Sequence, residues 1–82
     1  MLNNREKFTV VTFPNTSTAL AMEAACNAQG MPGRIIPVPD RINAGCGFAW
    51  LAAEEDRIKL ENFLEVKGLV FDCVYTLELD TF

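Results

Sequence analysis

The chain has 82 residues, a formal charge of −4, three cysteines and no histidine. Its length suits one domain, and 50% apolar with 22% charged residues suits a folded globular protein. An acidic chain without a Lys/Arg cluster argues against nucleic-acid binding, and no apolar run reaches the roughly 18 residues of a transmembrane helix. The polar segment 1–7 lacks the apolar core of a signal peptide, so we expect a cytoplasmic protein that is not bound to a membrane.

The cysteine pattern excludes several kinds of site. Cys26, Cys46 and Cys73 are an odd number at wide spacings, which argues against a disulfide framework and for reduced thiols. No pair has the CxxC spacing of a zinc or thioredoxin-type site, and the absence of histidine removes the commonest general base and metal ligand. We therefore expect no metal and no cofactor, although a site of three thiolates assembled by the fold stays an alternative.

The first third of the chain predicts a strand and a helix. Segment 8–13 is β-branched and aromatic with apolar residues on both faces, which indicates a central strand. Segment 18–29 is rich in alanine and predicts a helix that ends at Gly30. The candidate helix caps are Asn15, Thr16 and Ser17, and the apolar helix face consists of Ala19, Met22 and Cys26.

The remaining segments predict three strands and a second helix. Segment 34–39 contains two prolines, so its strand should lie at a sheet edge. Segment 48–51 is a short strand with apolar residues on both faces. Three acids at 54–56 favour a helix start, and the helix buries Leu60, Phe63 and Leu64 and ends at Gly68, with Ile58 exposed or covered by a partner. Segment 70–79 alternates as a last strand, with Phe71, Cys73, Tyr75, Leu77 and Leu79 on one face.

This order of elements predicts an α+β fold of the ferredoxin-like βαββαβ type. The four-stranded antiparallel sheet would have the order 4-1-3-2 with both helices on one face, which places the proline-bearing strand at an edge. We expect a single domain at 8–80 after a flexible N-terminal segment at 1–7. Because two helices cover one face only, either Phe48 with Trp50 or Ala49 with Leu51 faces away from them. Such an exposed apolar face suggests a homodimer that forms through the sheet, and the alternative is that edge loops and the N-terminal segment cover it.

The loop between segments 34–39 and 48–51 holds the strongest candidate for chemistry. Cys46 lies between Gly45 and Gly47, which leaves the thiol little side-chain cover and allows close approach of a partner. Backbone N–H groups there would bind a thiolate or persulfide, and Arg34 or Arg41 would lower the thiol pKa. The alternative is a small residue that fills a tight turn. We expect the other two cysteines in the core, where free cysteine is common.

Two stretches, TFPNTSTALAMEAACNAQG and RIIPVPDRINAGCGFAW, resemble a small bacterial family described as selenium/sulfur carrier protein-like. The resemblance covers roughly Phe8 to Leu79, and its specific part is Ile36 to Gly47. It implies that Cys46 carries sulfur or selenium. Family members often have serines just before the cysteine, whereas here Asn43, Ala44 and Gly45 stand there. Asn43 or backbone N–H groups would then take the place of those hydroxyls in binding the anion.

The resulting hypothesis is a carrier or binding module rather than a turnover enzyme. Cys46 would accept a sulfane sulfur or selenium atom as a persulfide-type adduct from a donor enzyme and pass it to an acceptor protein, with no cofactor. The alternative is a non-catalytic interaction or small-ligand-binding regulatory domain that self-associates through its sheet, in which Cys46 is only a turn residue.

Overall fold

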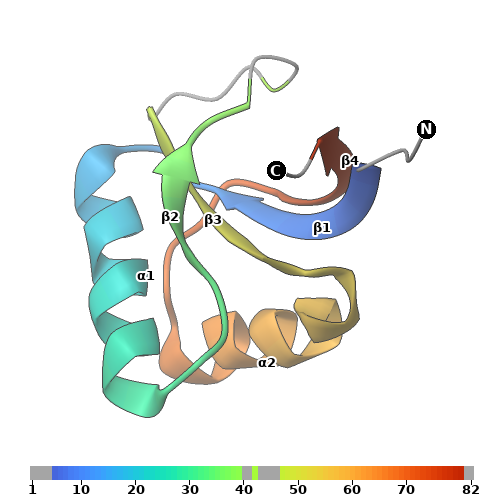
Figure 1. The fold of residues 1–82 in the computed structure, drawn as a ribbon. Helices are drawn as coiled ribbons and strands as arrows, with labels where there is room; N and C mark the ends of the chain where they lie inside the picture. Colours follow the sequence, from blue (N-terminus) through green and yellow to red (C-terminus); the bar gives the residue numbers. More distant parts are fainter. Residues whose placement is uncertain (1–4, 40–41, 43–46, 81–82) are drawn as a thin grey trace.

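The computed structural model describes residues 5–39, 42 and 47–80. Its elements, in chain order, are β1 (Arg5–Thr12), α1 (Thr16–Gln29), β2 (Arg34–Pro37), β3 (Phe48–Ala53), the 3₁₀ turn η1 (Glu54–Asp56), α2 (Arg57–Lys67) and β4 (Val74–Asp80) (Figure 1). No helix in this described part has both the length and the apolar content needed to span a bilayer.

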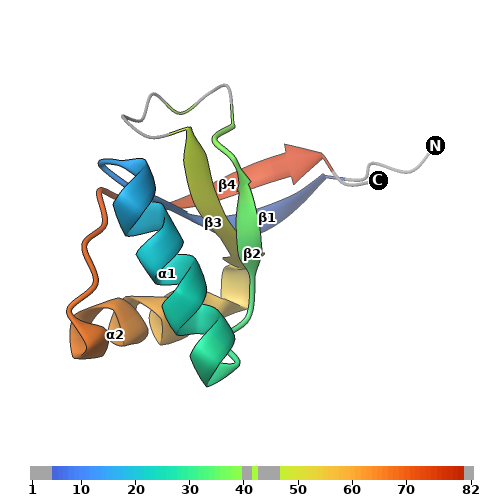
Figure 2. The ribbon, with the colours of Figure 1, turned by 90° about the vertical axis from the view of Figure 1, so that its left-hand side faces the viewer.

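The four strands form one antiparallel sheet in the order β2-β3-β1-β4, which is the expected order 4-1-3-2 in reverse. β1 pairs with β3 and β4, and β2 pairs with β3. Both helices lie on the same side of the sheet (Figure 2). The α+β ferredoxin-like prediction is therefore confirmed. β2 is an edge strand as its prolines required, because Pro37 has no N–H to give to a second neighbour.

The ends of α1 follow the sequence signals closely. The Asn15 side chain accepts a hydrogen bond of 2.9 Å from the Thr18 N–H, which caps the first turn. Gly30 ends the helix in the left-handed conformation, with φ of 67°. The expected apolar face is buried and consists of Ala19, Met22 and Cys26.

α2 starts later than the acidic run predicts. The three acids form the 3₁₀ turn η1, and the α-helix itself begins at Arg57 and ends at Gly68 in the left-handed conformation. Leu60 and Leu64 are buried as expected, and Phe63 packs against the core. Ile58 is 72% exposed in the single chain, as expected for a residue that is either exposed or covered by a partner.

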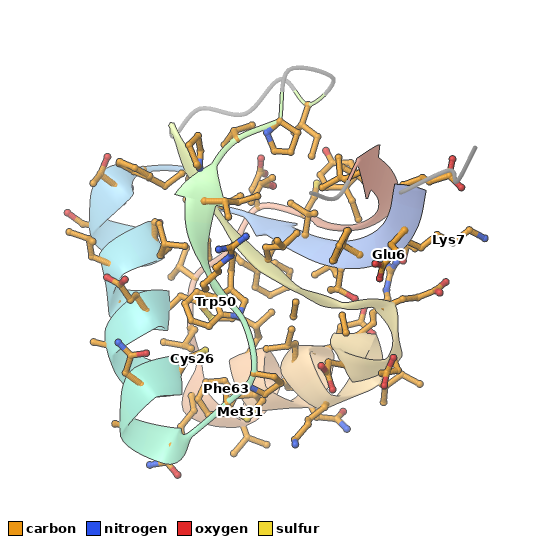
Figure 3. The ribbon with its side chains drawn as sticks, in the orientation of Figure 1. Glu6, Lys7, Cys26, Met31, Trp50 and Phe63 are labelled. Atoms are coloured by element: carbon orange, nitrogen blue, oxygen red, sulfur yellow. The ribbon has the colours of Figure 1, made fainter. Side chains whose placement is uncertain are left out.

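Apolar side chains form two layers, one on each side of the sheet. The larger layer lies between the sheet and the helices, where Figure 3 shows Cys26, Met31, Trp50 and Phe63 together. The second layer lies on the side without helices, which we call the open face. It consists of buried Val10, Ile42 and Ala49 and of half-buried Phe8, Ile36, Val38, Leu51, Tyr75, Leu77 and Leu79. Of the two pairs in segment 48–51, Ala49 and Leu51 therefore face away from the helices.

One expectation about the last strand is wrong. β4 begins at Val74 rather than at residue 70, and Cys73 is exposed instead of buried. The Asp72 N–H donates to the Thr12 carbonyl at 2.7 Å, and the Thr12 N–H donates to the Cys73 carbonyl at 2.9 Å. Asp72 and Cys73 thus both face Thr12 of β1, an arrangement known as a β-bulge. Regular pairing between the strands starts only at Val74, opposite Val11. The apolar alternation before Val74 therefore does not describe a strand.

Candidate functional site

The loop between β2 and β3 holds most of the expected site residues. Arg41, Asn43, Gly45 and Cys46 lie outside the described residues, whereas Arg34 and Gly47 lie within them. The geometry of the site is therefore given by the two ends of the loop and by the position of Arg34.

Gly47 is held at the mouth of the β2–β3 hairpin. Its carbonyl accepts a hydrogen bond of 3.1 Å from the Val38 N–H, one step beyond the pairing of Pro37 with Phe48. Gly47 is exposed, and a Cβ atom built on it would meet no atom within 4 Å. Gly47, which follows Cys46 in the chain, is thus held by its backbone, and no described atom lies close to the position of its missing Cβ.

Ile42 is a buried residue within the loop, which sequence reasoning missed. Its N–H donates to the Pro39 carbonyl at 2.9 Å, and its side chain is 8% exposed and packs in the open-face layer with Val10 and Ala49. The sequence contained a signal for this burial, since Ile42 is the one bulky apolar residue in the polar stretch at 40–45.

Arg34 lies at the other end of β2 from Gly47. It is exposed and pairs with Leu51, whereas Gly47 bonds to Val38, which follows β2. Arg34 instead borders a shallow hollow of about 430 Å³ together with Phe8, Leu51 and Asp56. The described residues therefore do not bring Arg34 and Gly47 together.

Cys26 is unsuited to thiol chemistry. It is fully buried in the layer between sheet and helices, and burial raises its pKa to about 11 from an ordinary value of 9.0. The thiolate is the nucleophilic form, so a thiol that is both inaccessible and protonated at neutral pH is inert. This agrees with the core position expected for Cys26.

Cys73, unlike Cys26, is an exposed thiol. Its N–H donates to the Thr12 hydroxyl at 3.2 Å, so the backbone at this exposed residue is fixed. A side-chain hydrogen bond with Cys73 raises the pKa of Tyr75, and the charge of Cys73, loss of solvent and the charge of Asp72 add to this in decreasing order. The polar Asp72 within the apolar stretch 69–75 is the sequence signal that the strand starts later. Any assignment of function to a cysteine must therefore distinguish Cys46 from Cys73.

No metal-binding group emerges within residues 5–39, 42 and 47–80: nowhere among them do three His, Cys, Asp or Glu side chains come together in a way that could hold an ion. 

Comparison with known proteins places the chain in a family. The family model described as "Putative Se/S carrier protein-like" matches residues 8–76, a span that runs from β1 into β4 and contains the whole β2–β3 loop. Comparisons with curated proteins and with solved structures gave no match. Because the matched span covers most of the 82 residues, the chain belongs to the Se/S carrier protein-like family.

Proposed function

We propose that this protein carries sulfur or selenium on Cys46 and hands it to a partner enzyme in the cytoplasm, where thiols stay reduced. The observation that carries the proposal is the family match across the Gly-Cys-Gly step. The fixed but uncovered position of Gly47 supports it, because a transferring thiol must be reachable and yet held in place.

The proposed transfer is a thiol exchange without net redox change. The Cys46 thiolate attacks the outer sulfur of a persulfide on the donor enzyme, the S–S bond of the donor breaks, and the donor cysteine leaves as a thiolate. Cys46 then holds the atom as a persulfide. The thiolate of the acceptor protein repeats the same step and returns Cys46 to its thiol form. A selenium atom would follow the same course.

Anion stabilisation is proposed for the residues that flank Cys46. Asn43 and the N–H groups of Gly45 and Gly47 would donate to the persulfide, and a guanidinium would lower the thiol pKa. Of the two arginine candidates, Arg34 lies at the far end of β2, so the proposal gives this role to Arg41. The two arginines can be compared by measuring the alkylation rate of Cys46 against pH in Arg41→Gln and in Arg34→Gln. Only Arg41→Gln should raise the apparent pKa of the Cys46 thiol.

The test of the carrier role is loading by a cysteine desulfurase supplied with cysteine or selenocysteine, followed by intact mass and peptide mapping. The wild type and Cys73→Ser should each gain one sulfur or selenium atom on Cys46, whereas Cys46→Ser should gain none. Cys73→Ser is the matched control, since Cys73 is the exposed cysteine among the described residues. An adduct that maps to Cys73, or none under conditions that load an established carrier, would contradict the proposal.

A second candidate function is an interaction domain that self-associates through its open face. The observation that favours it is the layer of apolar side chains from all four strands on the side without helices. If the protein is an interaction domain, Cys46 should be alkylated slowly. If it is a carrier, Cys46 should be alkylated fast.

A further inference from the structure

A groove of about 760 Å³ runs between α2 and the segment that connects α2 to β4. Figure 2 shows this segment leaving the C-terminal end of α2 and turning back toward β4. One wall is the helix stripe Arg57, Glu61 and Glu65, and the other wall is the chain from Leu69 to Val74. The groove uses none of the residues of the β2–β3 loop.

The groove and its rim offer apolar contacts for an outside side chain. Leu64 is buried and Leu69 packs against the core below the groove. Phe71 lines the groove and is 41% exposed, and Val70 next to it is 57% exposed. A half-exposed aromatic ring beside an apolar floor is the arrangement from which interface hot spots are built.

The charges around the groove are predominantly negative. Glu61, Glu65 and Asp72 line it against a single cation, Arg57. The Arg57 guanidinium is already engaged: Nε lies 3.4 Å from Glu61 Oε2, Nη1 donates to Thr76 Oγ1 at 2.7 Å, and Nη2 donates to the Val74 carbonyl at 3.2 Å. Within the described part of the chain, Glu65 and Asp72 have no ion pair. Their carboxylates therefore favour cations from outside.

One end of the groove approaches the start of β3. Thr12 pairs with Ala49 of β3 on one side and bonds to Cys73 on the other, and Cys73 lines the groove. The rest of the groove follows α2, away from the start of β3 (Figure 1).

From these observations we propose that the groove docks a segment of a partner protein in which a bulky apolar side chain is flanked by Lys or Arg. The apolar side chain packs on Phe71 and Leu69, and the cations pair with Glu65 and Asp72. The inference deepens the proposed carrier function by naming the chemistry of its partner.

The test is an amide-resonance NMR titration of the ¹⁵N-labelled Cys46→Ser protein, which keeps sulfur chemistry out of the measurement. The probe is a short amidated peptide with Lys and Leu around a central Phe, and the comparison is the same peptide with Glu in place of Lys. The Lys peptide should shift the amides of Gly68, Leu69, Phe71 and Cys73 in a saturable way. The Glu peptide should not.

Two pairs of variants sharpen the test. Glu65→Lys with Asp72→Lys should weaken binding of the Lys peptide about tenfold or more, because two surface ion pairs are replaced by repulsion. Glu54→Lys with Glu55→Lys makes the same charge change on η1 and should leave binding within about twofold. Phe71→Ala should weaken binding about tenfold, whereas Leu20→Ala, which truncates a 52% exposed residue on α1, should not.

Equal binding of both peptides, shifts confined to the open face, or no binding at millimolar peptide would each overturn the inference. None of these outcomes bears on sulfur loading of Cys46, which is measured separately on the protein with its native thiols. A failed carrier test with a positive titration would leave a docking domain without carrier chemistry, so the two proposals fail independently.

Discussion

At the scale of single residues, the tightest constraint in the fold lies where Gly33 meets Trp50. The indole Nε1 donates to the Pro32 carbonyl at 3.0 Å, which draws the backbone of Gly33 onto the ring. Gly33 has φ of 116°, and a Cβ there would come within 2.5 Å of the Leu51 carbonyl oxygen and still closer to the indole. Only glycine fits both the conformation and the space.

We therefore predict that Gly33→Ala lowers the free energy of unfolding by about 2–4 kcal/mol, since backbone strain and overpacking act together. The measurement is urea denaturation followed by Trp50 fluorescence. Gly47→Ala is the matched control, because its Cβ meets open space, and it should change stability by less than about 1 kcal/mol. Equal effects of the two substitutions would contradict the packing of Gly33.

The buried thiol of Cys26 predicts a loss of stability at high pH. The fold raises its pKa to about 11 from 9.0, so between these values the folded state binds more protons than the unfolded state. Stability is then fully present below pH 9 and falls as pH rises to 11, by about 2–3 kcal/mol for this residue. Urea denaturation from pH 8 to 11 should show this fall in the wild type and a smaller one in Cys26→Ala. Tyr75 is the same in both, so parallel curves would refute the assignment to Cys26.

At the scale of elements, Arg57 ties the start of α2 to the edge strand β4. Its guanidinium bonds to the Val74 carbonyl and the Thr76 hydroxyl, two groups on β4, as well as to Glu61. The pairing with Glu61 is a surface ion pair between i and i+4 and contributes little. The bonds to β4 are worth more, because they add a polar link between α2 and β4 to the packing of Val74 against the core that contains Leu60 and Leu64.

Arg57→Ala should lower stability by about 1–2 kcal/mol, and Arg57→Lys should recover little of it, since an ammonium cannot reach both groups on β4. A double-mutant cycle with Thr76→Val should give a coupling of about 0.5–1 kcal/mol. The double-mutant cycle of Arg57→Ala with Glu61→Gln should give a coupling energy less than half as large. Lys59→Ala, an exposed cation on the same helix, serves as the control. A larger coupling to Glu61 than to Thr76 would show that the tie to β4 is weak.

The elements themselves were largely predictable from the sequence, because their signals are local. The cap residue Asn15 and the terminal Gly30 predicted the ends of α1, and the prolines of segment 34–39 predicted the edge position of β2. The later start of β4 was not predictable from alternation, since it depends on how Thr12 bonds to both Asp72 and Cys73, 60 residues away or more. The groove and the accessible thiol of Cys73 follow from that bulge, and this is why sequence reasoning missed them.

At the scale of the whole molecule, the open face carries no helix, and within the described part of the chain its side chains other than Val10, Ile42 and Ala49 are only half-buried. The sequence indicated this by apolar residues on both faces of 48–51, and the sheet pairing resolves which residues face outward. Four strands of 8, 4, 6 and 7 residues, spaced about 4.8 Å apart, give a face on the order of 400 Å². This is about half of the roughly 800 Å² per partner in a standard stable interface.

A dimer through the open face is therefore expected to be weak, with a dissociation constant on the order of 100 µM. Sedimentation equilibrium from about 10 µM to 1 mM should show the transition, and Leu77→Lys should abolish it, because a charge at the centre of the β1–β4 side of the face would lose its water. Ile58→Lys is the control, since Ile58 is 72% exposed on α2 and lies on the opposite side of the sheet. If the wild type stays monomeric at 1 mM, or if both variants weaken association equally, the open face is not the dimer surface. A dimer disrupted only by Leu77→Lys would leave the groove beside α2 accessible, so that self-association and partner docking occur on separate faces of the same small domain.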